Sequence, residues 1–212
     1  DGLIDYPADP NCESAAGDSE TCDSSEPILE IVAGVTTGTT LGATNDYRPP
    51  PGSLNGVACS TTGNHTSPDL LYSMRLPATR ELNMTLTPVT PSGWNATLVL
   101  LDAACSDSAL ACSDSPTMPT QTNLADGFYH VVVDGYSTST GGTFNLNVSG
   151  TIETGGSCEV PLAQSGALTC APGFACQGPA GAQTCQPAAC NDGIDNDGDG
   201  KIDYPSDPGC LT

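Results

Sequence analysis

Residues Phe128 to Asp134, F-Y-H-V-V-V-D, form a short apolar run. A run of this length, rich in Val and aromatic residues, predicts a strand that is buried within a sheet. Ala96 to Leu101, A-T-L-V-L-L, is apolar on both faces and predicts a central strand. Leu82 to Val89 and Phe144 to Ile152 alternate between apolar and polar residues, which predicts strands with one face in the core and one in solvent.

Three further stretches predict strands: Ile28 to Val32, one strand within Thr36 to Asp46, and Leu70 to Leu76. Pro49 to Pro51 interrupts them, and Gly/Pro-rich turns separate the others. Helical periodicity is absent from this part of the sequence. Strands spaced in this way, with turns and no helices between them, predict an all-β fold with two packed sheets, a β-sandwich.

Charge and cysteine content restrict the function. The chain has 212 residues with 4 Lys and Arg against 25 Asp and Glu, so its formal net charge is −21. Such a surface repels nucleic acid and anionic membranes and attracts divalent cations. No apolar run approaches the roughly 20 residues of a membrane span, and without an initiator Met or a signal peptide we expect a mature or partial chain. Eleven cysteines with only two histidines predict disulfides, an oxidising compartment and an extracellular protein.

A second informative stretch is Cys190 to Cys210, C-N-D-G-I-D-N-D-G-D-G-K-I-D-Y-P-S-D-P-G-C. It contains the D-x-D-x-D-G spacing of a calcium loop, in which alternate carboxylates converge on a hard cation and Gly200 allows the sharp turn. Pro205 and Pro208 exclude the exiting helix of an EF-hand, so the loop resembles those of thrombospondin type 3 repeats and related bacterial calcium repeats. The predicted Ca²⁺ ligands are Asp195, Asp197, Asp199, the backbone carbonyl of Lys201, Asp203 and Asp207.

The alternative for this stretch is a solvated acidic turn without metal. Five aspartates lie within the twelve residues from Asp192 to Asp203, and they repel one another unless a counter-ion is close. The metal-binding interpretation is therefore favoured.

The beginning of the chain repeats this motif. Asp1 to Cys12, D-G-L-I-D-Y-P-A-D-P-N-C, matches Asp199 to Cys210 at most positions. The chain therefore begins inside a calcium loop whose first half is missing, and Asp1 and Asp5 are further candidate ligands. Equivalent ends suit head-to-tail assembly of copies of the chain.

Four segments follow from this organisation: residues 1–27 as a partial calcium loop and acidic connector, 28–153 as the sandwich, 154–189 as a Cys-rich spacer, and 190–212 as the stapled calcium loop. The spacer has too few apolar residues for a core of its own, so disulfides must hold it.

The expected pairs are Cys190 with Cys210, Cys105 with Cys112, and Cys22 with Cys59, with two bonds of open connectivity among Cys158, Cys170, Cys176 and Cys185. A Cys190–Cys210 bond contributes on the order of 3 kcal/mol. Cys12 is left unpaired, or bonded to chain upstream of Asp1.

Four N-x-S/T sequons are present, at Asn64, Asn83, Asn95 and Asn147. Alternation places Asn83 and Asn147 on solvent faces of their strands, and the other two lie in a loop and after a turn. We therefore expect covalent glycans at these four sites, although the same residues also suit ordinary surface amides. Thr36 to Thr40 and Ser115 to Thr122 are candidate O-glycan stretches.

Four motifs carry a family resemblance: Gly42 to Tyr47, Pro68 to Tyr72, Asp102 to Cys105 with Ala111 to Asp114, and Asp126 to Tyr136. Together they resemble the bacterial pre-peptidase C-terminal (PPC-like) domain over roughly residues 28–152. The resemblance implies a jelly-roll-type β-sandwich attached to secreted proteins, some of which bind calcium or matrix polymers. Asp46, Asp69 and Asp134 match acidic positions of this pattern, where turn capping is favoured over metal binding.

No catalytic motif is evident. His65 and His130 have no neighbouring nucleophile motif, and G-x-S-x-G, H-E-x-x-H and P-loop patterns are missing, so we expect no enzyme. The favoured function is a subunit of a glycosylated extracellular fibre or surface layer, stabilised by Ca²⁺ and disulfides, with Ile28 to Val32 available to pair with a neighbour. The alternative is a non-catalytic matrix- or carbohydrate-binding module of a larger secreted protein. It lacks an aromatic platform, since Trp94 is the sole Trp and adjoins the sequon at Asn95.

Overall fold

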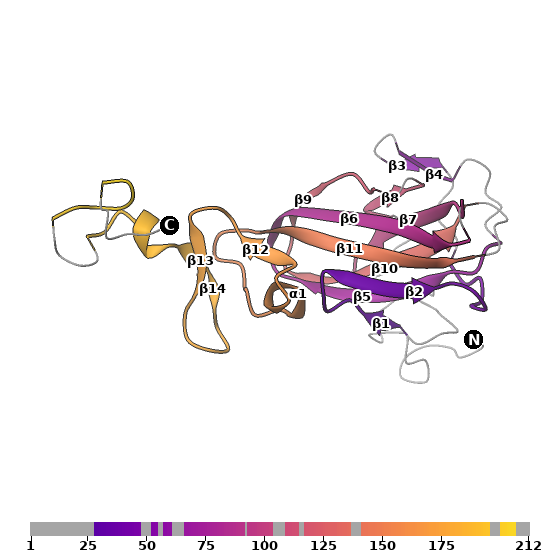
Figure 1. Ribbon diagram of the computed structural model, residues 1–212, viewed down its shortest axis with the longest axis horizontal. Helices are drawn as coiled ribbons and strands as arrows, with labels where there is room; N and C mark the ends of the chain where they lie inside the picture. Colours follow the sequence, from indigo (N-terminus) through magenta and orange to yellow (C-terminus); the bar gives the residue numbers. More distant parts are fainter. Residues whose placement is uncertain are drawn as a thin grey trace.

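The computed structural model is a sandwich of two five-stranded sheets with a narrow extension at one end (Figure 1). The structure describes residues 28–47, 52–54, 57–60, 66–91, 93–103, 109–114, 117–136, 141–195 and 200–206. Nearly all of its regular structure is β, so the predicted all-β sandwich is confirmed.

The first sheet, sheet A, contains the two strands that the sequence marks as fully apolar. Its order is β1 (Leu29–Glu30), β5 (Leu70–Leu76), β10 (Gly127–Gly135), β7 (Ala96–Leu101) and β8 (Ala111–Ser113). β1 runs parallel to β5, and the other pairs are antiparallel. β10 and β7 therefore lie in the interior of the sheet, as their apolar character predicts.

The second sheet, sheet B, is built around β11. Its order is β12 (Leu168–Cys170), β11 (Thr143–Ile152), β6 (Thr79–Thr90) and β9 (Gln121–Leu124), and β2 (Val35–Thr39) also pairs with β11. β2 covers the first half of one edge of β11, and β12 runs parallel to the last three residues of that strand.

Two hairpins and two short helices complete the described structure. They are β3 (Gly52–Leu54) with β4 (Val57–Ser60), β13 (Phe174–Gln177) with β14 (Thr184–Pro187), α1 (Pro161–Gln164), and the 3-10 helix η2 (Ala189–Asn191). In Figure 1 the β13–β14 hairpin and η2 extend away from the sandwich along the long axis of the molecule. We call residues 157–191 the arm. The structure describes no helix that is long and apolar enough to cross a membrane.

The core between the sheets follows the alternation in β6 and β11. The inward side chains of β6 (Leu82, Met84, Leu86) and of β11 (Phe144, Leu146, Val148) are all at most 2 % exposed. Phe144 packs edge-on against Tyr72 and tilted against Trp94, with ring centroids 6.3 Å apart in each pair. Period-2 patterning therefore locates this core from sequence alone.

A second, smaller cluster covers the outer face of sheet A. It consists of Tyr47, Leu71, Val99, Leu101, Ala109, Cys112 and Val132, with Ile28 packed against it. Because both faces of sheet A are covered, all six residues of β7 are buried. The outward polar side chains of β10, His130 and Asp134, are also buried.

The strand predicted at Ile28 to Val32 is shorter than expected. Only Leu29 and Glu30 form β1, and they pair with Tyr72 and Ser73 of the same molecule. Ile31 is 1 % exposed in the main core, which anchors this segment to its own sandwich.

Gly150 lies where the arm meets the sandwich, and a substitution there tests how closely the two are packed. It is paired with Leu82 of β6 and Leu168 of β12, and an added Cβ would overlap the backbone carbonyl of Glu81. We expect Gly150→Ala to lower the free energy of unfolding by roughly 1–3 kcal/mol, because the close strand contact must open.

Chemical denaturation of that variant is to be compared with Gly127→Ala. A Cβ at Gly127 would meet only the Tyr129 ring, at 3.9 Å. Its expected effect is within about 0.5 kcal/mol. Equal effects of the two substitutions would contradict the proposed packing at Gly150.

Candidate functional site

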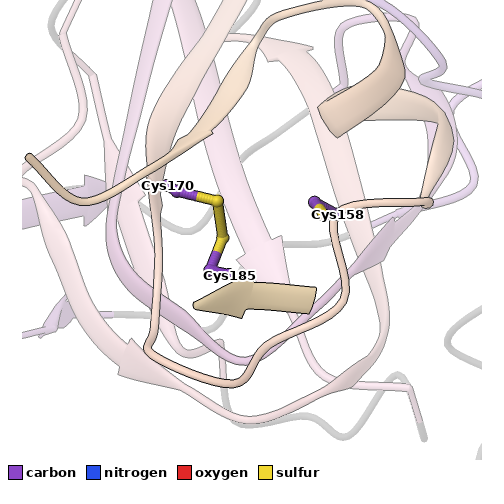
Figure 2. A group of neighbouring side chains, drawn as sticks. All are labelled: Cys158, Cys170 and Cys185. Atoms are coloured by element: carbon purple, nitrogen blue, oxygen red, sulfur yellow. A yellow bond between two sulfur atoms is a disulfide. The ribbon is translucent and has the colours of Figure 1, made fainter. Parts of the chain in front are cut away.

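Two disulfides hold the arm together. Cys158 is bonded to Cys176 and Cys170 to Cys185, with Cα atoms 5.9 and 5.4 Å apart. The structure thus supplies the connectivity that the sequence leaves open. In Figure 2, Cys170 and Cys185 are joined by their sulfur atoms, and Cys158 lies nearby.

These sulfurs do not form a metal site. Among the residues that the structure describes, Cys158, Cys170 and Cys185 are the one group of three potential ligands whose donor atoms lie within 4.8 Å of one another. A metal requires thiolates, whereas each of these sulfurs is already bonded in a disulfide.

Backbone hydrogen bonds fix the arm to the end of β11. The N–H of Gly155 donates to the carbonyl of Cys185 at 2.8 Å, and the N–H of Cys185 donates back to Gly156 at 2.9 Å. Leu162 of α1 and Leu168 of β12 reach into the main core. The base of the arm is therefore packed against the sandwich and hydrogen-bonded to it.

The acidic loop predicted at Cys190 to Cys210 begins where the arm ends. The carbonyl of Gly173 accepts hydrogen bonds from the Ala188 N–H at 2.9 Å and from the Asn191 side chain at 3.3 Å. Cys190 is disulfide-bonded, and its carbonyl accepts the N–H of Tyr204 at 3.3 Å. The start of the loop and its return segment are thus held beside the hairpin.

Two carboxylates organise the turn of the loop. Asp203 accepts the N–H groups of Asp192 at 3.1 Å and of Gly193 at 2.8 Å. Asp195 accepts the N–H of Gly200 at 2.9 Å, so the sixth residue of the motif folds back onto the first carboxylate. Gly200 has φ +87°, the left-handed backbone that the motif reserves for glycine. These contacts fit a loop that wraps around a cation.

Spacing alone did not mark Asp192 as part of this turn. Its Oδ1 accepts the N–H of Ile194 at 2.8 Å. The Asp192-Gly193 pair is the turn signal that identifies it.

The predicted metal site lies partly within the described residues. Asp195, Lys201 and Asp203 are described, and the carboxylates of Asp195 and Asp203 each accept backbone N–H groups from other residues of the loop. The remaining predicted ligands, Asp197, Asp199, Asp207, Asp1 and Asp5, lie outside the described residues. Calcium binding therefore stays a prediction.

Several predicted disulfides also lie wholly or partly outside the described residues. Cys112 is disulfide-bonded. The expected partners Cys210 and Cys105, and the sulfur atoms of Cys22, Cys59 and Cys12, are outside the described part, so these pairings stay predictions.

A second acidic feature lies on the outer face of sheet A. Asp69 is 2 % exposed, and its Oδ2 accepts the N–H groups of Asp46 at 2.9 Å and Tyr47 at 3.0 Å. This carboxylate caps the turn that lays Tyr47 over the sheet, which agrees with the turn-capping interpretation of the acidic motif.

Asp134, at the end of β10, is fully buried near Asp69. Its Oδ1 accepts the N–H of Gly135 at 2.6 Å. Burial, and then the nearby carboxylate of Asp69, raise the pKa of Asp134 to about 8. Asp134 therefore holds a proton at neutral pH, which removes most of the repulsion between the two groups.

The described sequons lie at the surface. Asn83 on β6 and Asn95 before β7 are exposed, and Asn147 on β11 is half-buried on the outer face of sheet B. The side-chain oxygen of Asn83 also accepts a hydrogen bond from Thr120 at 2.7 Å. Asn64 lies outside the described residues, and glycan attachment at all four sites stays a prediction.

Neither His130 nor Trp94 faces a cleft. His130 is 1 % exposed, and its Nδ1 lies 3.3 Å from the carbonyl oxygen of Asp102. Trp94 is 5 % exposed and packs in the main core. Both side chains are therefore packed inside the fold.

Comparison with known proteins finds weak likenesses to solved structures. No protein-family model and no curated protein matches the chain. The pre-peptidase C-terminal domain of a collagenase from Bacillus anthracis is 16 % identical with a TM-score of 0.39, covering 58 % of this chain and 96 % of that one. PliG from Aeromonas hydrophila, a periplasmic inhibitor of g-type lysozyme, is 14 % identical with a TM-score of 0.37, covering 57 % and 94 %. Neither likeness is close enough to support an argument about function.

The disulfides of the arm are open to a direct test. Replacing Cys170 and Cys185 together by Ala should destabilise the arm by about 3 kcal/mol, because the open chain gains conformational freedom when unfolded. Hydrogen exchange should show faster exchange at β13 and β14 amides. β6 and β11 amides in the same sample serve as the control, and unchanged protection of the hairpin would disprove the stabilising role of this bond.

The raised pKa of Asp134 predicts a pH-dependent stability. In the unfolded chain this carboxyl ionises near pH ~4, so its contribution to folding is complete below that pH and is lost as the pH rises towards about 8. Relative to wild type, Asp134→Asn should gain roughly 3 kcal/mol between pH 5 and pH 8. The measurement is urea unfolding in chelator-containing buffers.

The matched control is Glu81→Gln, which removes an exposed carboxylate from β6. Its difference from wild type should vary little with pH. A constant offset between Asp134→Asn and wild type across this range would contradict a protonated Asp134.

Proposed function

We propose that this protein is a non-catalytic structural component of an extracellular fibre or surface layer, and that its acidic loop binds Ca²⁺. Its disulfides indicate an exported protein, because such bonds persist in oxidising compartments. The observation that carries the proposal is the arm. It is hydrogen-bonded to the sandwich, cross-linked twice and directed away from it, so it presents the acidic loop at one end of an elongated molecule (Figure 1).

The position of the acidic loop matters because of the net charge of −21. Copies of such a chain repel one another at every acidic surface. A divalent cation bound where two ends meet lowers that repulsion locally. Calcium-dependent end-to-end contact is therefore the arrangement that this charge distribution favours.

The alternative function is a matrix- or carbohydrate-binding module. The burial of Trp94 removes it as a stacking platform for sugars. Phe128 is exposed, but the guanidinium of Arg75 lies 5.4 Å from its ring centroid. These observations make the structural role the better supported of the two.

Calcium binding by the loop is tested with single carboxylate variants. We expect Ca²⁺ at about 10 mM to stabilise the loop by roughly 1–3 kcal/mol, given a dissociation constant of the ~10⁻⁴–10⁻³ M typical of extracellular sites. Asp195→Asn and Asp203→Asn should abolish this stabilisation, measured by calorimetric titration and by hydrogen exchange at Gly193 and Gly200. Asp192→Asn, in the same turn but outside the D-x-D-x-D-G series, should retain it.

Assembly is tested separately, by electron microscopy and light scattering of the purified chain with Ca²⁺ or with chelator. Regular filaments or sheets that dissolve on chelation support the proposal. A monomer that instead sediments with cellulose, chitin or collagen would refute it in favour of the binding module.

A further inference from the structure

Thr97 is a buried residue for which the fold offers no explanation. It lies in β7, opposite Asp134 of β10, and is 0 % exposed. Its hydroxyl is buried and has no hydrogen-bond partner among the residues that the structure describes. An unsatisfied buried hydroxyl destabilises a folded protein, whereas Val has almost the same shape and favours strands.

The same residue completes a sequon. Asn95, Ala96 and Thr97 read N-A-T, the N-x-S/T acceptor signal in which the third residue must carry a hydroxyl. Asn95 is exposed immediately before β7, so a glycan attached there would lie in solvent. The acceptor is thus compatible with the folded protein, but the hydroxyl that must be recognised is inaccessible in it.

We infer that Asn95 is N-glycosylated before the chain folds, and that Thr97 is present for this transfer and not for the fold. Thr97 alternates with the inward-facing Ala96 and Leu98, so its side chain lies on the outer face of sheet A together with Val99 and Leu101. It is 0 % exposed there, so no enzyme can reach its hydroxyl while this face is covered. The backbone of Asn95 is also held, since its carbonyl accepts the N–H of Tyr136 at 2.8 Å. Modification must therefore precede the covering of this face of sheet A.

The co-reactant is an oligosaccharide activated on a lipid-linked diphosphate. The Nδ2 atom of Asn95 forms a bond to the anomeric carbon of the sugar, and the bond from that carbon to the diphosphate oxygen breaks. The diphosphate leaves with the electron pair, and the amide loses one proton to a base of the transferase. No oxidant or reductant is required.

The two sequons of sheet B are compatible with the same order of events. Asn147 lies opposite Thr85, and Asn83 lies opposite Ser149, so each acceptor faces the hydroxyl residue of the other sequon across the β6–β11 pair. Asn147 is also flanked by Val35 of β2 on its other side. A transferase that binds either sequon as a separate extended segment has to act before β6 and β11 pair.

This inference rests on the proposed glycoprotein character of the chain but not on fibre assembly. Its first test compares Thr97→Val, Thr97→Ser and Asn95→Gln after secretion from a glycosylating host. Glycopeptide mass spectrometry should find sugar at residue 95 in wild type and Thr97→Ser, and none in the other two variants.

The second test uses protein exported from a host without N-glycosylation. Thr97→Val should have a higher midpoint of thermal unfolding than wild type, because it removes the unsatisfied hydroxyl. Asn95→Gln should leave the midpoint unchanged. A lower midpoint for Thr97→Val would overturn the inference, since it would mean that the hydroxyl has a structural partner such as a bound water or ion.

The third test offers the folded and the reduced, unfolded unglycosylated chain to a purified oligosaccharyltransferase with its lipid-linked donor. Transfer to Asn95 should occur only in the unfolded chain. Transfer to the folded chain, or to neither, would overturn the inference. Loss of Ca²⁺-dependent assembly with transfer as expected would instead count against the fibre proposal alone.

Discussion

Hydrogen bonding of β11 along both edges is the constraint on which the rest of the structure depends. β6 pairs with it from Thr143 to Ile152, while β2 covers the first half of its other edge and β12 the end. The sandwich and the arm therefore share one strand. The arm has few apolar residues, yet its orientation relative to the sandwich is fixed because β12 extends sheet B. The disulfides then need only hold the β13–β14 hairpin beyond β12.

Both faces of sheet A are covered, and this buries polar side chains. Polar side chains that alternation would place in solvent are enclosed, and each meets this constraint differently. Asp69 accepts two backbone N–H groups, and His130 lies within hydrogen-bond distance of a backbone carbonyl. Asp134 keeps a proton. The Thr97 hydroxyl has no hydrogen-bond partner in the part of the chain that the structure describes, and we propose that it serves glycan transfer before folding.

The fold could be predicted where side-chain periodicity carries the information. Burial on one face made β6 and β11 recognisable, and burial on both faces did so for β7 and β10. β8 and the arm strands were missed because three or four residues are too few to show a period-2 pattern. Regular spacing revealed the acidic loop, but no local pattern in the sequence encodes the burial of Asp134.

Charge is distributed unevenly over the molecule, which bears on how it meets partners. The outward side chains at the centre of sheet B, Asn83, Thr85, Thr87, Asn145 and Asn147, are neutral hydroxyls and amides. The carboxylates of this chain of net charge −21 lie elsewhere, for example at Glu81 near the start of β6 and in the acidic loop. A glycan on this neutral face would cover no charged side chain, whereas the acidic loop attracts cations. The proposed glycans of sheet B and the proposed calcium-dependent contact are therefore compatible with one another, because they would act on different surfaces of the molecule.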